Sequence, residues 1–423
     1  MPQWTGLTRG PSQEGVSLGL TEIGALDRRM TAIFREEAAR LTASLVRLLG
    51  DFDEAEELVQ EAILSALEHW PTDGIPDRPG AWLLTTARRK AVDRWRRQAR
   101  YREKLALVQD PAGQRVGREV DDRLRLIFTC CHPALSRDAQ LALTLRAVIG
   151  LTTAEIARAF LTTEVAIAQR IVRAKRKIVD AGIPYRVPEA AQLPERLEEV
   201  LAVLYLMFNE AYLATAGDQP ARHDLAADAE WLSGLLVRLL PDEPEPMGLL
   251  ALIRLHRART RSRFDADGHL VLLRDQDRGL WDRALIESGV ALIHQAGGLG
   301  RPGPYQLQAA IAACHAEARS YGETDWEQIV LLYQALLRRT PSPVIQLNYA
   351  IALLHVAGPE PALREAERAG AALQRYHLYH ATRAELLRAL GRFDEARDAD
   401  RRALELTLNP AERALLEDRL ASG

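Results

Sequence analysis

Apolar side chains recur every three or four positions along most of this chain, the spacing that places them on one side of a helix. Ile33, Leu41 and Leu45 form such a stripe in residues 31–49, and the pattern returns in residues 51–70. Aromatic residues make up only 6% of the 423 positions, and the helix formers Ala, Leu, Arg and Glu dominate. We therefore expect an all-α fold, divided into several domains because of its length.

No segment of the sequence has the pattern of a membrane anchor or an export signal. The longest uninterrupted apolar run, residues 200–208, covers nine positions, whereas a membrane-spanning helix needs about 20. The first thirty residues have Gly, Pro and Glu where a signal peptide has a basic start and an apolar centre. Three cysteines, two of them adjacent, cannot form a disulfide framework. We expect a cytoplasmic protein that makes no membrane contact.

Charge is concentrated in three segments, although the net charge of the chain is only −3. Six acids lie within residues 51–61. Residues 88–104 contain nine basic and two acidic side chains, a net charge of +7, and residues 170–177 contain five basic side chains and no acid. Each segment taken alone is also compatible with a solvated helix face.

Residues 151–178 have the pattern of a helix-turn-helix. Thr152 or Thr153 can cap a short helix, and Thr162 or Thr163 can cap a second helix after a turn. On the second helix the apolar side chains share one side, and the other side presents Gln169, Arg170, Arg173, Arg176 and Lys177. Such donors can reach base edges and phosphates in the major groove. The pattern predicts binding to duplex DNA, although short helix pairs also occur without DNA.

The basic segment 81–102 is expected to form a helix that contains two tryptophans, Trp82 and Trp95. Proteins that hold open single strands combine a cationic groove with flat side chains on which bases stack. Trp95 and Tyr101 lie within the basic run and suit this role. We expect Trp82 to pack in the core, whereas for Trp95 core packing and base stacking are equally compatible with the sequence.

Three motifs in order give residues 31–181 a resemblance to the extracytoplasmic-function (ECF) group of sigma-70 initiation factors. The first motif is acidic and reads Asp51-Phe-Asp-Glu-Ala-Glu-Glu-Leu-Val-Gln-Glu. The second is basic and reads Ala81-Trp-Leu-Leu-Thr-Thr-Ala-Arg-Arg-Lys-Ala-Val-Asp-Arg-Trp-Arg-Arg. The third consists of Glu155-Ile-Ala followed by Arg170-Ile-Val-Arg-Ala-Lys. Because the motifs are long and correctly spaced, the resemblance is specific.

The resemblance implies core RNA polymerase and promoter DNA as partners, with a role for individual side chains. Contact with the polymerase clamp is implied for Asp53, Glu54, Glu57, Gln60 and Glu61. Melting and reading of the minus-ten element is implied for Arg88, Arg89, Lys90, Asp93, Arg94 and Arg97, to which we add Trp95 as a stacking surface. Reading of the minus-thirty-five element is expected for Thr163, Glu164, Ala166, Gln169, Arg170, Arg173 and Lys177. Many family members carry Gly-Thr-Val-Lys where this chain has Val165-Ala-Ile-Ala, so the promoter sequence that it reads must differ.

The remainder of the chain is longer than a two-domain sigma factor requires. Small residues recur at a spacing of 34, the tetratricopeptide (TPR) period, at Ala350 and Ala384 and again at Ala362 and Ala396. This spacing predicts three degenerate TPR-like repeats. We expect a flexible N-terminus (1–28), a region 2-like domain (29–104), a linker (105–120), a region 4-like helix-turn-helix domain (121–182), a helical extension (183–308) and the repeats (309–423).

Such an extension resembles the TPR-bearing ECF subgroup, in which the C-terminal part is thought to stand in for a separate anti-sigma protein. Stacked helix pairs form a concave surface that usually holds a peptide or a protein, so we expect a partner there, either intramolecular or separate. The segments Phe208–Tyr212 and Asp275–Asp282 also belong to the pattern of this subgroup. Helix caps and hydrogen bonds are a better explanation than a carboxylate cluster for the acids Glu210, Asp218, Asp275 and Asp277.

The sequence contains no typical metal site or catalytic centre. Cys130-Cys-His and Cys314-His lack the ligand spacing of structural zinc sites, so we expect core cysteines. No phosphate-binding loop, HExxH motif or nucleophile elbow is present. We therefore expect no metal, no cofactor and no enzymatic activity.

Two functions are compatible with these features. The first is a promoter-specificity subunit of RNA polymerase with a regulatory helical extension, and the second is a free-standing transcriptional activator whose helix-turn-helix binds duplex DNA. Only an initiation subunit needs both the acidic helix and the basic, tryptophan-bearing helix. The sequence therefore favours the first function.

Overall fold

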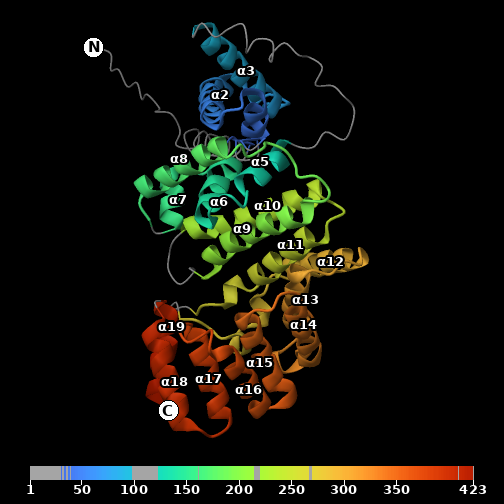
Figure 1. Cartoon of the computed structure of the whole chain (residues 1–423), viewed down its shortest axis with the longest axis vertical. Helices are drawn as coiled ribbons and strands as arrows, with labels where there is room; N and C mark the ends of the chain where they lie inside the picture. The colour runs from blue at the N-terminus through green and yellow to red at the C-terminus, as the bar shows by residue number, and fades with distance from the viewer. Residues whose placement is uncertain are drawn as a thin grey trace, which may run out of the picture. The chain divides into compact units, whose positions relative to one another are not determined.

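A computed structural model describes residues 30, 33–34, 37–38, 40–97, 122–160, 162–213, 220–265, 269–407 and 409–422. Within these residues the regular structure is helical, and the extended pairing is limited to one isolated bridge between Phe264 and Leu270. The expected all-α fold is therefore confirmed. The chain divides into two compact units, Met1–Val200 and Leu201–Gly423 (Figure 1). The segments 1–28 and 105–120, expected as a flexible N-terminus and a linker, lie outside the described residues.

The first unit begins with two packed helices, α2 (Phe52–Asp73) and α3 (Pro79–Arg97). Asp51 caps α2, since its carboxylate accepts hydrogen bonds from the backbone N–H groups of Asp53 and Glu54 at 2.8 and 3.0 Å. The buried side of α2 carries the predicted apolar stripe, Ala55, Leu58, Val59 and Ala62.

The sequence predicts a loop over residues 71–79 and places Leu67 on the apolar stripe of the helix before it, and the structure differs at both points. The loop begins later, because α2 continues through Pro71 and ends at Asp73, and Gly74, which caps the helix, has a φ of +83° that suits glycine. Leu67, which follows the apolar stripe at helical spacing, is 46% exposed. The aromatic core here is instead made by Trp70, which lies 5.4 Å from Phe34 and 5.5 Å from Trp82 between ring centroids. Trp82 thus packs against the core, as expected.

A second helical group completes the first unit. Its elements are α5 (Asp122–Cys130), α6 (Arg137–Thr144), the π-helical turn η1 (Leu145–Ile149), α7 (Thr153–Ala159) and α8 (Glu164–Asp180). Phe128, Leu143 and Leu145 are fully buried in its core. Cys130 and Cys131 are buried there as free thiols, and burial raises the pKa of Cys131 to about 11, so this thiol stays protonated and inert at neutral pH.

The second unit is a continuous series of helices, which starts within α9 (Leu193–Leu213). The following helices are α10 (Pro220–Leu239), α11 (Pro244–Arg257), α12 (Arg283–Gly298), α13 (Pro304–Glu317), α14 (Trp326–Arg339), α15 (Pro343–Ala357), α16 (Pro359–Gly370), α17 (His377–Ala389), α18 (Phe393–Leu406) and α19 (Pro410–Ser422). Short 3₁₀ turns occur at Thr260–Ser262, Leu273–Asp275, Arg278–Leu280 and Tyr321–Glu323. In the described part of the chain, no helix is long and apolar enough to cross a membrane.

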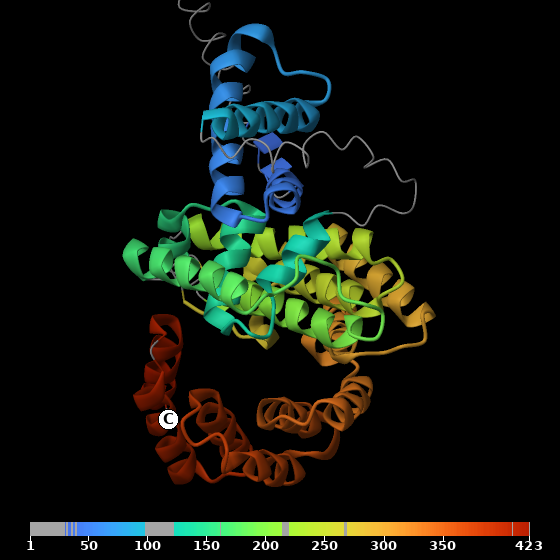
Figure 2. The same ribbon diagram turned by 45° about the horizontal axis from the view of Figure 1, so that its top comes forward.

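The last four long helices before α19 repeat with a fixed period. Helices α15 and α17 begin 34 residues apart, and so do α16 and α18. Ala350 and Ala384 are fully buried, and Ala362 and Ala396 are as well, so each pair of small side chains allows close packing of neighbouring helices. Figure 2 shows that α13–α19, coloured orange to red, follow a curve. The preceding pair departs from the period, since α13 and α14 begin 39 and 33 residues before α15 and α16.

The segment Asp275–Asp282 has a structural role in the second unit. The Arg278 guanidinium donates hydrogen bonds to the backbone carbonyls of His315 and Ala318 and lies over the Trp281 ring, 4.6 Å from its centroid. The Trp281 indole N–H donates to Ser262 Oγ at 2.8 Å. This segment therefore ties the end of α13 to the loop after α11.

The described members of the set Glu210, Asp218, Asp275 and Asp277 serve local structure, which agrees with the expectation of caps and hydrogen bonds. Asp277 accepts from the Gly279 N–H at 2.8 Å, and Asp275 lies 3.5 Å from Arg274. The side chains of Glu210 and Asp218 lie outside the described residues, as do those of most of the Phe208–Tyr212 segment. Among the described side chains, no group of three or more metal-ligating residues is assembled.

Candidate nucleic-acid interface

The residues of α2 that were expected to bind polymerase share one side of the helix. Asp53, Glu57 and Gln60 are exposed, and Glu54 and Glu61 are half-buried. The apolar residues of the opposite side pack into the core, so the position of each acid is fixed by the helical period.

Two basic residues of α3 neutralise part of this acidic side. Arg94 lies 2.6 Å from the Glu57 carboxylate and 2.5 Å from that of Glu61, and Lys90 Nζ lies 3.8 Å from Glu61. The structure thus brings together residues that the sequence assigned to two different partners. Arg94 and Lys90 are shared between the acidic face and the basic helix.

Two other basic residues of α3 face solvent. Arg88 and Arg89 are exposed, as is the acidic Asp93. Trp95 and Arg97 belong to the last turn of α3, but their side chains lie outside the described residues. The described cationic surface of α3 is therefore centred on Arg88 and Arg89.

The helix-turn-helix is built by α7 and α8. Thr152 and Glu155 form a reciprocal cap at the start of α7, with the Thr152 N–H donating to the Glu155 carboxylate at 2.7 Å and the Glu155 N–H donating to Thr152 Oγ1 at 3.2 Å. Thr163 caps α8 by accepting from the Ala166 N–H at 3.2 Å. Thr152 rather than Thr153 therefore caps α7, and Thr163 rather than Thr162 caps α8.

Helix α8 separates its side chains as the sequence predicts. Ile167, Ile171, Ala174 and Ile178 are buried. The solvent side holds the residues expected to read the upstream promoter element, with Thr163, Glu164, Gln169, Arg173 and Lys177 exposed and Ala166 and Arg170 half-buried. Arg170 lies 3.4 Å from Asp138 on α6, so part of its charge is used within the domain.

Sequence reasoning missed a contact between α8 and α2. Lys175 Nζ lies 2.6 Å from Asp53 Oδ1 and 3.2 Å from Glu56 Oε1, and Arg146 Nε lies 3.4 Å from Glu56 Oε2. We call these four residues the α2–α8 clasp. Lys175 is only 10% exposed, whereas Asp53 is 79% exposed. One signal was available in the sequence, because Lys175 follows the buried Ile171 by four residues and therefore shares its side of the helix.

Tyr185, in the segment after α8, packs against other parts of the first unit. Its hydroxyl hydrogen bonds to the backbone carbonyls of Ala43 and Asp122 at 2.8 and 3.2 Å, and its ring meets Phe52 edge-on. Burial, together with the nearby charge of Asp122, raises the pKa of this hydroxyl, so it remains a hydrogen-bond donor. The segment that follows α8 is therefore anchored to the start of α2 and the start of α5.

Three parts of the chain match the models of known protein families. Residues 33–101 match the model of sigma-70 region 2, and residues 125–178 match that of sigma-70 region 4. Residues 196–297 match a family of unknown function, DUF6596.

Two individual relatives match the chain over different lengths. An uncharacterized protein of Rhizobium meliloti (strain 1021) is 46% identical over 411 residues, which cover 95% of this chain and 96% of that protein. The ECF RNA polymerase sigma factor SigL of Mycobacterium tuberculosis is 34% identical over 151 residues, which cover 34% of this chain and 81% of SigL. On these matches, the chain belongs to the ECF group of sigma-70 family RNA polymerase sigma factors.

Proposed function

We propose that this sigma factor binds core RNA polymerase through the acidic side of α2, opens the minus-ten element with α3 and reads the minus-thirty-five element with α8. One observation carries the proposal: the three charged surfaces lie on three rigid helices within one unit, with their apolar sides packed. Arg88 and Arg89 supply exposed cations on α3, and Gln169 and Arg173 supply donors on α8. These residue types suit phosphate contacts and base-edge contacts, respectively.

The clasp adds a step to this function. Lys175 competes with polymerase for Asp53, because its ammonium lies 2.6 Å from Asp53 Oδ1 and neutralises negative charge that the proposed contact requires. We propose that binding of α2 to the polymerase clamp displaces Lys175 from Asp53. We infer that the chain described here is a closed form and that holoenzyme assembly opens the α2–α8 clasp.

The second unit is proposed to regulate initiation. Its last four long helices before α19 have the 34-residue period and the buried small residues of TPR-like pairs, and such pairs provide a curved inner surface for a ligand or partner. The match of residues 196–297 to a separate family is consistent with an added module. The alternative of a free-standing activator gives no role to region 2, which this chain contains.

Transcription by core polymerase with and without the full-length chain tests the proposal. Sheared genomic DNA serves as template, and transcript 5′ ends are mapped. With the chain present, we expect new start sites that share an upstream and a downstream sequence element at constant spacing. Core polymerase alone should not start at these sites. Identical start sites with and without the chain would contradict the proposed function.

A further inference from the structure

Three valines lie on the solvent side of α8 at intervals of seven residues. Val165, Val172 and Val179 are 65%, 64% and 74% exposed. Seven residues correspond to two helical turns, so the three side chains form one line along the helix. Single exposed apolar side chains are ordinary on protein surfaces. A regular line of them, on a helix whose opposite side packs in the core, favours an apolar contact with a partner of this domain.

Part of this line lies among the residues that are proposed to face promoter DNA. Ala168 and Gln169, which are both exposed, occupy the turn between Val165 and Val172. In the segment where many ECF factors have Gly-Thr-Val-Lys, this chain has valine in place of the glycine and alanine in place of the lysine. Its surface is therefore more apolar at these positions. We call Val165, Ala168 and Val172 the valine patch.

The base edges of the major groove offer one prominent apolar group, the 5-methyl group of thymine. Small apolar side chains can cover this methyl, whereas guanine and cytosine present hydrogen-bonding groups in the groove. Gln169 suits the same base pair, because a glutamine amide can bond to N6 and N7 of the adenine that pairs with thymine. The valine patch and Gln169 together therefore match an A·T base pair.

We propose that the valine patch reads thymine methyl groups in the minus-thirty-five element, through Val165 and Val172. This inference rests on the proposed function, because it requires α8 to lie in the major groove. Seven residues of helix span about 10 Å and successive bases rise by about 3.4 Å, so the thymines that are read lie within about three base pairs of each other. Recognition helices contact base edges with their N-terminal residues, so Val179, two turns further along α8, lies outside the contact.

Deoxyuridine substitution tests the proposal without altering the protein. Holoenzyme is reconstituted from core polymerase and the full-length chain, and its equilibrium affinity is measured for a promoter duplex mapped by transcription. Each thymine of the upstream element is replaced in turn by deoxyuridine, which lacks only the methyl group. At one position or more, we expect binding to weaken by about three- to fourfold, the effect of one buried methyl. Replacements between the two promoter elements are the control for the DNA and should have no effect.

Two results of this scan would overturn the inference and leave the proposed function intact. One is an upstream element that contains no thymine, and the other is equal affinity for every duplex in the series. In both cases the holoenzyme still binds its promoter, so α8 would read it through other groups. A holoenzyme that selects no promoter would instead contradict the proposed function, and this inference with it.

Serine substitutions identify the side chain that meets each methyl. Each deoxyuridine effect should disappear in Val165→Ser or in Val172→Ser. Val179→Ser is the matched control at a similarly exposed position of the same helix, and it should retain every effect. Effects that persist in both patch variants would overturn the proposal, because other groups would then contact the methyls. Weaker binding of the patch variants to core polymerase, with unchanged deoxyuridine effects, would also overturn it and would assign the valines to a protein contact.

Discussion

Lys175 Nζ on α8 lies 2.6 Å from Asp53 Oδ1 on α2 and joins two segments that are 122 residues apart in the sequence. The lysine is nearly buried, and it also lies 3.2 Å from Glu56, whose other oxygen is near Arg146. A residue from the region 4 domain thus holds a residue from the acidic side of α2. If α2 binds polymerase as proposed, this ion pair links assembly with polymerase to the packing of α8 on α2.

Removing the Lys175 charge should loosen the closed form. In Lys175→Met the apolar stem remains but the ion pairs to Asp53 and Glu56 are lost. The free energy of unfolding of the first unit should therefore fall by about 1–3 kcal/mol. Affinity for core polymerase should rise, because Asp53 no longer has to be released. Urea unfolding and fluorescence anisotropy of labelled chain titrated with core polymerase measure the two effects.

Lys177→Met is the matched control for this change, because Lys177 lies two residues away on the exposed side of α8. Lys177→Met should leave the free energy of unfolding and the affinity for core polymerase unchanged. A Lys175→Met variant that binds core polymerase no better than the natural chain would argue against a competing clasp.

Reversing one charge on α2 should weaken polymerase binding. Glu57 is 62% exposed and bonded to Arg94, and Glu57→Lys places a cation where the proposed contact requires an anion. We expect a loss of at least tenfold in affinity for core polymerase with little change in helix content. Glu68→Lys, at an exposed position three turns further along α2, is the control. Equal effects of the two reversals would refute a local contact at Glu57.

Arg88 and Arg89 should act in DNA opening. Both are exposed on α3, and replacing both with Ala should slow formation of the open complex and flatten its dependence on salt, since each lost phosphate contact lowers the slope by about 1. Fluorescence of 2-aminopurine placed in the minus-ten element follows the opening. Arg78→Ala, which alters an exposed arginine just before α3, should open DNA at the normal rate. Normal opening by the double variant would exclude these arginines from melting.

The second unit should lose stability in mild acid. Burial lowers the pKa of His256 to about 3 and that of His315 to about 4, with nearby arginines adding to both effects. An unfolded histidine titrates near 6.5. Between pH 6.5 and these lower values, the unfolded chain therefore binds more protons than the folded chain. The free energy of unfolding has its full value above pH 6.5 and decreases as the pH falls.

Each histidine should contribute a loss of about 2 kcal/mol between pH 7 and pH 5. Urea unfolding of the full-length chain, followed by tryptophan fluorescence, measures this loss. Substituting His256→Gln should reduce the pH dependence. A pH-independent midpoint between pH 7 and pH 5 would show that these rings bind protons as readily in the folded chain as in the unfolded chain.

Local features were predictable from sequence because they depend on nearby residues. The Thr163 cap, the buried Ile167 and Ile171 and the exposed Arg173 all follow from helical spacing around one turn. The 34-residue spacing of Ala350 and Ala384 similarly anticipated the matching starts of α15 and α17.

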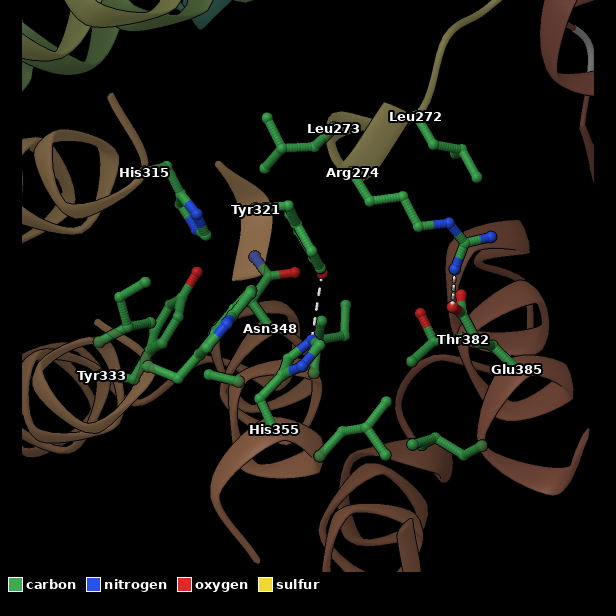
Figure 3. Close-up of a pocket in the computed structure, with 16 residues that line it drawn as sticks. Leu272, Leu273, Arg274, His315, Tyr321, Tyr333, Asn348, His355, Thr382 and Glu385 are labelled. Carbon is green, nitrogen blue, oxygen red and sulfur yellow. Dashed lines mark hydrogen bonds and ion pairs between the residues drawn. The ribbon is translucent and has the colours of Figure 1, made fainter. Parts of the chain in front are cut away.

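Features that depend on tertiary contact were not predictable in the same way. The pairing of Lys175 with Asp53 requires two distant helices to meet, and the sharing of Arg94 between Glu57 and Glu61 depends on how α3 lies on α2. The continuation of α2 through Pro71 was also missed, because a proline in the last turn costs only one helical hydrogen bond there and Trp70 just before it is anchored in the core. The cavity lined by His315, Tyr333 and Asn348 combines side chains from several helices, including α11, α13, α14 and α15, so it cannot be predicted from any single segment. Figure 3 shows the same three residues where they also line a neighbouring cavity.

Equilibrium binding of the reconstituted holoenzyme to one mapped promoter tests the central claim most directly. Arg173→Ala should reduce promoter affinity by about 1–3 kcal/mol, the range for one lost base contact, and should relax discrimination in the upstream element. Arg186→Ala, at an exposed arginine beyond α8 that pairs with Glu189, should bind with unchanged affinity. Core binding should be normal for both variants. If Arg173→Ala bound the promoter with full affinity and full discrimination, the assignment of α8 as the upstream reader would be contradicted.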